Sequence, residues 1–461
     1  MSRLDGYHIM VVSQYFLTII DFINLEFVSK KYEGNIDKFH NNPIQINKTT
    51  LKYFSHLETL NVWSKESELF GNVLFNKIER TGKDSVFNFE TKFYQINIWF
   101  EVDYTLTQVH KNSNFCFKNV VYTEKDRLNF GEVIPTSIRS LGEKCFSSSQ
   151  MTSIQIPNNV TDIKRLCFVQ CHLLELIILP SYMKIINNCT FYGCSALKSI
   201  VVPNAVTSFE YECFKNCEQL SLVSMLNAVI YFKDFCFDNC KKLATIDFES
   251  IEFLGDNCFE RCTLLKRVEI PKLNDYLAKQ AFYSCSSLSI VDIQGNYDRI
   301  GCECFYNCVS LVSVSFPDSI TCFGNRCFSG CSELKTISLP KKLKNLAEEC
   351  FSRCLKLKEI EIPNEVTKIY NSCFMECSML EKVQLPNGIS EINEDTFFKC
   401  RKLNTINIHK NVKYLRGGCF EDCNSLDICV PTTVVHCDQF CFKNCKSVVN
   451  QKKKTGFLFW F

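Results

Sequence analysis

The chain has 461 residues, 46% of them hydrophobic, and its 52 Lys and Arg residues against 50 Asp and Glu residues leave a formal charge of +2. This balance, with no basic block in the regular part of the chain, argues against nucleic acid as the main partner, because nucleic-acid binding needs a concentrated positive surface. No run of about 18 apolar residues occurs, so the sequence predicts no transmembrane segment.

The first residues also argue against a targeting peptide. Residues 7–20 are fairly apolar, but they contain His8, Ser13 and Gln14, and no small-residue cleavage site follows them. We therefore expect a cytoplasmic protein. A peripheral position at the plasma membrane or the cell surface, reached without a signal peptide, is the alternative.

Residues 1–45 predict a small helical module. Apolar residues recur at helical spacing between Val11 and Ile20. Asp21 is placed to cap a second helix, in which Phe22 and the apolar residues that follow share one face. Because repeat arrays need their open core ends covered, one interpretation of this module is a helical cap on the rest of the chain.

The second interpretation comes from a resemblance. Residues 16–32 resemble the core of an F-box, in which an apolar helix is followed by a capped helix that ends near Val-Cys-Lys. Ser29 stands where that family often has Cys, and Leu4 is followed by Asp5 rather than by Pro. The resemblance implies that residues 4–32 bind the linker protein of a cullin-type ubiquitin ligase.

Residues 46–123 do not hold a regular period. The stretches 57–63 and 94–100 alternate apolar and polar residues, which is typical of half-buried strands. Residues 114–120 echo the Cys-Phe-Lys-Asn-Cys of residues 441–445. We interpret this region as degenerate repeats that cap the array.

From residue 124 to residue 450 the chain repeats every 22 or 23 residues, in 14 copies. Each copy starts with a small residue followed by Phe, and in 13 copies a Cys stands four residues after the start. This piece is expected to form a short helical turn. Leu-x-x-Ile-x-Ile-Pro then predicts a short strand that Pro ends, and Val-Thr-x-Ile predicts a second extended segment. The starts are Cys145, Cys167, Thr190, Cys213, Cys236, Cys258, Ala281, Cys304, Cys327, Cys350, Cys373, Thr396, Cys419 and Cys441.

No single copy can bury its apolar face alone, so the copies must stack into a solenoid with parallel strands. The pattern resembles the BspA-like type of leucine-rich repeat. This resemblance implies a curved solenoid that serves as a binding surface and not as an enzyme, in some members at cell surfaces, in adhesion. The predicted fold is an α/β leucine-rich-repeat solenoid of short parallel strands and short helical turns, with an N-terminal helical cap.

The chain has 30 cysteines, and 24 of them occupy the two small-residue positions of the repeat. Side chains four apart on a helix have Cβ atoms ~5–6 Å apart, which is wider than the ~3.8 Å of a disulfide. The residues that replace Cys at these positions are Ser149, Thr190, Ala281 and Thr396. We therefore interpret the cysteines as free, small core residues, which suits a reducing compartment.

Binding is expected on the outward positions of the first strand of each copy. The early copies present apolar side chains there, and an exposed apolar patch usually marks an interface. The later copies present polar side chains, among which acidic residues outnumber basic ones. The alternatives are that the first apolar residues lie under the cap and that the charges are ordinary surface. The candidates are Leu176, Ile178, Leu222, Thr245, Asp247, Arg267, Glu269, Asp292, Glu359, Glu361 and Lys382.

Residues 451–461 combine Lys452–Lys454 with the aromatic stretch Phe457–Phe461. Two interpretations stay open for residues 452–461, a cap on the last repeat and weak contact with an anionic membrane surface.

No nucleotide-binding loop, zinc-protease His pair or nucleophile elbow occurs, so we predict no catalysis, no cofactor and no metal site. The predicted function is a non-catalytic scaffold that recognises protein ligands. Its alternatives are a substrate-recruiting adaptor of a cullin ubiquitin ligase and a surface-associated adhesion or receptor-like protein.

Overall fold

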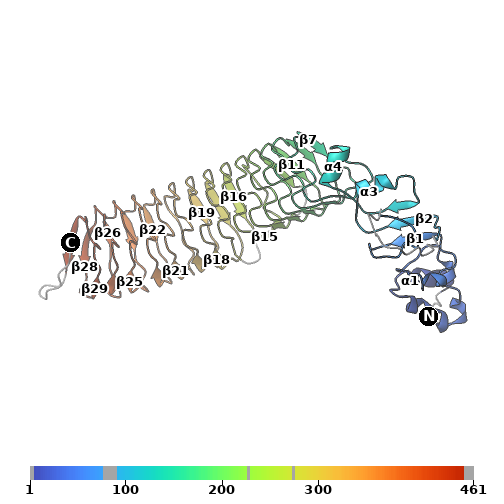
Figure 1. Cartoon of the computed structure of the whole chain (residues 1–461). Helices are drawn as coiled ribbons and strands as arrows, with labels where there is room; N and C mark the ends of the chain where they lie inside the picture. The colour runs from blue at the N-terminus through green and yellow to red at the C-terminus, as the bar shows by residue number, and fades with distance from the viewer. Residues whose placement is uncertain (1–4, 76–90, 226–228, 272–275, 451–461) are drawn as a thin grey trace, which may run out of the picture. The chain divides into compact units, whose positions relative to one another are not determined.

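The computed structural model describes residues 5–75, 91–225, 229–271 and 276–450. The chain forms two compact units, Met1–Gly142 and Glu143–Phe461, which are taken in turn (Figure 1). The membrane or capping role predicted for residues 451–461 falls outside the described residues.

The first unit begins with two short helices, α1 (Gly6–Ser13) and α2 (Ile19–Val28). Thr18 caps α2, and the carboxylate of Asp21 accepts the Thr18 backbone N–H at 2.9 Å. The prediction that Asp21 itself caps the helix was therefore wrong, because a Thr-x-x-Asp capping box starts the helix three residues earlier. Three single 3-10 turns follow, η1 (Lys30–Tyr32), η2 (Ile36–Lys38) and η3 (Leu51–Tyr53).

The rest of the first unit is built on parallel strands. The two alternating stretches predicted as strands are β1 (Thr59–Val62) and β2 (Gln95–Ile98), which pair with each other, and β2 pairs with β4 (Phe115–Phe117). A second group joins β3 (Val102–Asp103), β5 (Val120–Tyr122) and β6 (Ser140–Leu141). Helices α3 (Tyr104–Val109) and α4 (Glu124–Phe130) lie between these strands in the sequence.

The second unit is the predicted solenoid, in which each copy of the repeat forms one coil. Its strands form two ladders, and Figure 1 shows β16, β19, β22 and β26 along one edge and β15, β18, β21 and β25 along the other. The first ladder contains β7 (Ser153–Gln155), β9 (Leu176–Ile178), β11 (Ser199–Val202), β13 (Leu222–Met225), β16 (Arg267–Ile270), β17 (Ile290–Ile293), β19 (Ser313–Ser315), β22 (Glu359–Glu361), β24 (Lys382–Gln384), β26 (Thr405–Ile406), β28 (Asp427–Val430) and β30 (Ser447–Asn450).

The second ladder contains β8 (Asp162–Ile163), β10 (Ile185–Ile186), β12 (Ser208–Phe209), β14 (Tyr231–Phe232), β15 (Phe253–Leu254), β18 (Arg299–Ile300), β20 (Cys322–Phe323), β21 (Asn345–Leu346), β23 (Lys368–Ile369), β25 (Glu391–Ile392), β27 (Tyr414–Leu415) and β29 (His436–Cys437). Within the ladders the assigned strand pairs are parallel, as in Val268 opposite Val291 and Ile360 opposite Val383. The expected leucine-rich-repeat solenoid is confirmed.

The Cys-Phe-x-x-Cys piece differs from the expected helical turn. The described residues of the second unit contain no α-helix, and this piece consists of tight turns in which two residues four apart have left-handed backbone angles, such as Glu349 (φ +51°) and Arg353 (φ +59°). Every second N–H donates to the next coil, as from Phe351 to Cys373 O at 2.9 Å. Partners in the neighbouring coil thus replace the partners that a helix would supply.

The phenylalanines of these turns form one buried column through the solenoid. The ring centroids of neighbouring coils are 5.2–5.7 Å apart, and the rings are close to parallel, as for Phe328 and Phe351 with an interplanar angle of 6°. The column gives each coil the same large apolar contact with the next.

The second cysteine of each coil has a role that the sequence did not indicate. Its S–H donates to the backbone carbonyl of the phenylalanine one coil earlier, as from Cys354 to Phe328 O at 3.3 Å. All 30 cysteines are free thiols. The donors are Cys171, Cys194, Cys217, Cys240, Cys262, Cys285, Cys308, Cys331, Cys354, Cys377, Cys400, Cys423 and Cys445.

Cys354→Ala is expected to lower the free energy of unfolding by about 1–2 kcal/mol, because it removes this hydrogen bond and leaves a small void. Cys350→Ala is the matched control, since Ala281 naturally occupies the same first position in another coil, and its expected cost is below about 1 kcal/mol. Urea unfolding in reducing buffer measures both. Equal losses would show that the second cysteine contributes only its volume.

The stability of the solenoid is expected to fall steeply in alkaline solution. Burial raises the pKa of Cys308 and Cys377 to about 12, whereas an ordinary thiol titrates near ~8.5. The unfolded chain therefore loses these protons first, so the stabilisation is complete below about pH 8.5 and declines as the pH rises towards 12, by about 1.4 kcal/mol per thiol and pH unit. Urea unfolding followed by circular dichroism between about pH 7 and 10.5 measures the decline. An unchanged free energy of unfolding at about pH 10 would contradict it.

Candidate functional site

The outward face of the first ladder carries an apolar patch, formed by Leu176, Ile178, Val201 and Leu222. Leu176 and Ile178 on β9 are each 49% exposed, Val201 on β11 is 61% exposed and Leu222 on β13 is 55% exposed. β9 lies beside β11, and β11 pairs with β13. The patch borders a hollow of about 500 Å³ that Pro203 helps to line. These exposures place all four side chains on the outward side of the ladder.

The next two candidates lie outside any strand. Thr245 and Asp247 are both exposed, but the first ladder has no assigned strand between β13 and β16. The carboxylate of Asp247 accepts the backbone N–H of Glu249 at 2.9 Å. These residues therefore separate the apolar patch from the charged part of the face.

The middle candidates have their charges satisfied within the face. Arg267 Nη2 lies 2.8 Å from Glu269 Oε1 on the same strand, β16. On β17, the carboxylate of Asp292 accepts hydrogen bonds from the hydroxyl of Ser315 and, at 3.0 Å, from Gln294. These two hydrogen bonds, that of Ser315 foremost, hold the pKa of Asp292 below its ordinary value.

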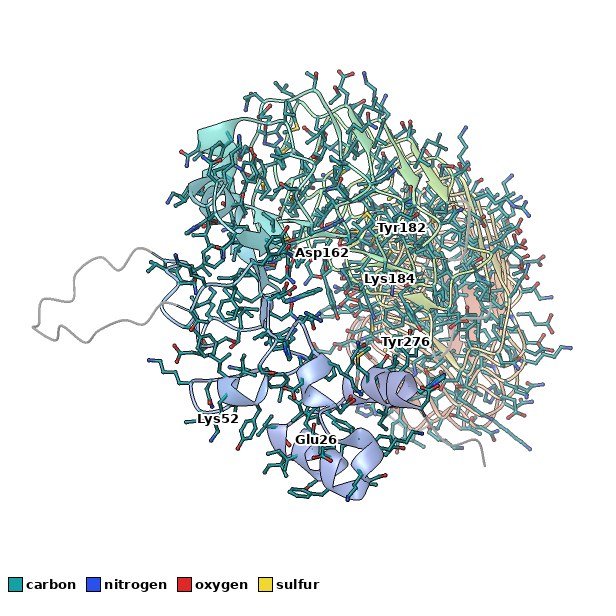
Figure 2. All side chains as sticks on the ribbon, turned by 90° about the vertical axis from the view of Figure 1, so that its right-hand side faces the viewer. Glu26, Lys52, Asp162, Tyr182, Lys184 and Tyr276 are labelled. Carbon is teal, nitrogen blue, oxygen red and sulfur yellow. The ribbon has the colours of Figure 1, made fainter. Side chains whose placement is uncertain are left out.

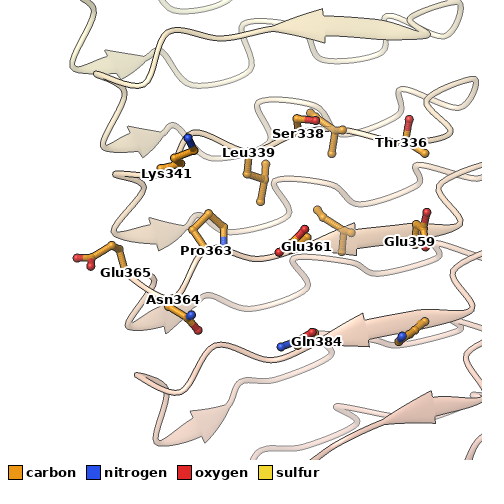
Figure 3. A pocket seen from close by; sticks show the side chains of 13 residues that line it. Thr336, Ser338, Leu339, Lys341, Glu359, Glu361, Pro363, Asn364, Glu365 and Gln384 are labelled. Carbon is orange, nitrogen blue, oxygen red and sulfur yellow. The ribbon is translucent and has the colours of Figure 1, made fainter.

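The last candidates form a second hollow, the charged groove, defined by Glu359, Glu361 and Lys382 (Figure 3). The register places Glu359 opposite Lys382, and the groove has a volume of about 730 Å³. Lys341 and Glu365 line it from the turns that follow the strands. Sequence reasoning missed these two residues, although both follow the Pro that ends the strand pattern.

The second ladder presents exposed aromatic side chains on consecutive coils. Tyr231 is 37% exposed, Phe253 38% and Tyr276 46%; Figure 2 labels Tyr276 together with Tyr182 and Lys184 of the same unit. The Lys233 ammonium lies 5.2 Å from the ring centroid of Tyr231 and 4.6 Å from that of Phe253. Because cation–π contacts already occupy the rings of Tyr231 and Phe253, we assign no ligand to those two rings.

A buried carboxylate on the turn side was also missed by the sequence analysis. Asp238 is 3% exposed, and its oxygens lie 3.4 Å from Lys215 Nζ and 3.9 Å from Arg261 Nη1. Burial, helped by the nearby charge of Glu260, raises the pKa of Asp238 to about 6. Cations from the two neighbouring coils face it, which is typical of a structural ion cluster, so we assign it no chemistry.

The helices α1 and α2 and the connection between them expose an unexpected number of apolar side chains. Tyr15 is 79% exposed, Leu17 87% and Phe27 85%. The buried faces of the module are made by residues such as Phe22, whose ring contacts Phe16, Phe39 and Phe54 at centroid distances of 5.0–6.1 Å. The helical surface is defined here as Tyr7, Tyr15, Leu17, Ile20, Phe27 and Val28.

Among the described residues, no group of three or more His, Cys, Asp or Glu side chains is arranged to hold a metal ion. In the same part of the chain, every helix is too short or too polar to cross a membrane.

The comparisons with known proteins agree with this architecture. A family model described as the BspA type leucine-rich repeat region matches residues 113–244, 207–335, 252–381, 298–427 and 367–455. The crystal structure of a leucine-rich repeat protein from Bacteroides ovatus is 27% identical, covers 68% of this chain and 78% of its own, and has a TM-score of 0.50. Among proteins with curated descriptions, none matches.

Two further solved structures are similar to this chain. A leucine-rich repeat protein of T. pallidum is 28% identical over 35% of this chain and 78% of its own, with a TM-score of 0.33. A leucine-rich cell surface protein from Faecalibacterium prausnitzii is 20% identical over 66% of this chain and 89% of its own, with a TM-score of 0.43.

Proposed function

The chain belongs to the BspA-type leucine-rich repeat family, and we propose that it is a non-catalytic scaffold that binds a protein partner along the outward face of its first strand ladder. The observation that carries the proposal is the apolar patch. Four aliphatic side chains on neighbouring strands leave about half of their surface in water, beside a hollow of about 500 Å³. Exposed apolar patches rimmed by polar residues are typical of protein interaction sites.

The apolar patch and the charged groove contribute differently to the binding of the partner. Covering a Leu or Ile side chain contributes roughly 1.5–3 kcal/mol, so the apolar patch supplies most of the affinity. The charged groove contributes selectivity, because its carboxylates, Glu359, Glu361 and Glu365, outnumber its ammonium groups, Lys341 and Lys382, and so favour a cationic group on the partner.

The triple variant Ile178→Ser, Val201→Ser and Leu222→Ser is expected to lose the bound partner at least about tenfold while it unfolds at nearly the native temperature, because these side chains are already half in water. The control changes three exposed turn leucines, Leu173, Leu264 and Leu355, to Ser. Affinity purification of the intact chain, followed by mass spectrometry and a binding titration of the recovered protein, measures the loss. Equal recovery by both triple variants would place the binding site elsewhere.

The second candidate function is that of a substrate-recruiting adaptor of a cullin ubiquitin ligase. Two observations favour it: the F-box resemblance of residues 16–32 and the exposure of the helical surface. Leu and Phe side chains that are as exposed as Leu17 and Phe27 are unfavourable in water and indicate a partner that covers them. In this function, residues 4–32 bind the ligase linker and the solenoid holds the substrate.

The double variant Leu17→Asp and Phe27→Asp is expected to abolish co-purification of a cullin-linker protein, because it places two charges where an apolar contact is required. Deletion of residues 1–45 is expected to have the same effect, and both changes leave the partners of the solenoid in place. Val109→Asp, at another exposed apolar residue of the first unit, is the matched control. Absence of any ligase component from the intact chain would leave the module as a cap.

For the compartment we propose a reducing one, the cytoplasm, since 30 free thiols are more compatible with it than with an oxidising exterior. A surface-associated adhesion or receptor-like role remains the third proposal, with a peripheral location at the plasma membrane or cell surface.

A further inference from the structure

The outward face of β1 and β2, in the first unit, combines amide and indole side chains. Asn61 on β1 stands directly opposite Asn97 on β2, while the residues on either side of them, such as Leu60 and Val62, are buried. Trp63 stands two residues after Asn61 and is 37% exposed, and Trp99 stands two residues after Asn97 and is 46% exposed. They are two of the three tryptophans of the chain. The face therefore offers rigid aromatic surface beside a row of amides.

These side chains are held in place by hydrogen bonds among themselves. Asn61 Oδ1 accepts from Asn97 Nδ2 at 2.9 Å and from Trp99 Nε1 at 3.1 Å. Gln95 Nε2 donates to Asn97 Oδ1 at 2.5 Å. Beneath the row, the fully buried Asn42 donates to Asn61 O at 2.8 Å, and Asn61 Nδ2 donates to Asn42 O at 3.0 Å. A face fixed in this way loses little conformational freedom when a ligand binds.

The row keeps both donors and acceptors that its own hydrogen bonds do not use. A side-chain amide has two N–H donors and an oxygen with two acceptor positions. Within the described residues, Asn61 retains one N–H, Asn97 retains one N–H and one acceptor position, and Gln95 retains one N–H and its whole oxygen. Such a mixture suits hydroxyl groups, because each hydroxyl both donates and accepts.

The outward face of β1 and β2 is uncharged. Its side chains are Thr59, Asn61, Trp63, Gln95, Asn97 and Trp99. On β4, which pairs with β2, Cys116 lies opposite Asn97, and Lys118 two residues later places one cation at the flank of the face. The side chains of β1 and β2 offer no opposite charge to a phosphate, a carboxylate or an ammonium group, which would lose its hydration without compensation. The chemistry that suits these two strands is therefore neutral and polar on its edges.

We propose that this face binds a neutral carbohydrate, with a hexose ring of a glycan lying against Trp63 and Trp99 and its hydroxyls bonded to Gln95, Asn97 and Asn61. The electron-rich faces of the indoles attract the polarised C–H groups of a sugar ring. A proline-rich peptide fits less well, because it offers mainly carbonyl acceptors and the indole N–H of Trp99 is already donated to Asn61. This binding is independent of the function proposed for the solenoid.

The test is tryptophan fluorescence of the full chain carrying Trp460→Phe, so that Trp63 and Trp99 are its only indoles. The probes are the neutral hexasaccharides of cellulose, amylose, chitin and β-mannan, added one at a time, and a decaproline peptide. At least one sugar is expected to shift the emission in a saturable way, and the peptide is expected to have no effect.

Trp99→Ala and Asn97→Ala are each expected to weaken the binding of that sugar by about tenfold or more, as the loss of a stacked ring or of a hydrogen-bonding amide implies. The affinity of these two variants for the sugar is measured by calorimetry rather than by fluorescence. Val109→Ala and the triple variant of the apolar patch are the controls and are expected to bind it unchanged.

Three results would overturn the proposal. The first is no emission shift with any of the four sugars; a lowered unfolding temperature of Asn97→Ala would then show that the amide row only stabilises the sheet. The second is a shift with decaproline alone, which would make the face a peptide site. The third is sugar binding that survives both Trp99→Ala and Asn97→Ala.

Discussion

Backbone hydrogen bonds from one coil to the next are the constraint on which the second unit depends. In each turn every second N–H donates to a carbonyl of the following coil, as from Phe351 to Cys373 and from Arg353 to Met375. These bonds set the spacing between coils, and the phenylalanine rings and the thiols then stack at that spacing. The two left-handed residues of each turn cost conformational energy, which the bonds between coils offset.

The same constraint shapes the outward face. Because the backbone fixes which residues stand opposite one another, outward side chains of neighbouring coils lie about 4.8 Å apart in straight rows. A run of aliphatic residues in such rows becomes the apolar patch, and a run of charged residues becomes the charged groove. The outward face of the first ladder is therefore a rigid surface whose composition changes along its length.

Much of this architecture was readable from the sequence. The period of 22 or 23 residues predicted the solenoid, and alternation predicted which side chains face outward. The turn conformation was not readable, because two small residues four apart suit a helical turn and a pair of left-handed turns equally well. The S–H hydrogen bonds of residues such as Cys354 were hidden too, since replacement by Thr, Ser or Ala in other coils indicates size alone.

Within the candidate sites, prediction ended where a contact depends on a partner distant in the sequence. The hydrogen bond from Ser315 to Asp292 joins residues 23 positions apart, on neighbouring coils. The bond between Asn61 and Asn97 joins residues 36 positions apart, across a region with no regular period. The exposure of Leu17, between α1 and α2, and of Phe27, on α2, likewise follows from packing that no pattern in residues 1–45 specifies.

The equivalence of the coils has a genetic consequence. Each coil offers its neighbours the same phenylalanine and cysteine columns, so recombination that adds or removes one whole 23-residue unit leaves every column continuous. An insertion of a single residue, by contrast, turns the inward side chains of a strand outward. The number of coils in such a protein can therefore change in whole units without disturbing the core. Each coil gained or lost between the apolar patch and the charged groove changes the distance between these two sites by one strand spacing, about 4.8 Å. Selection on the length of a ligand can act directly on coil number.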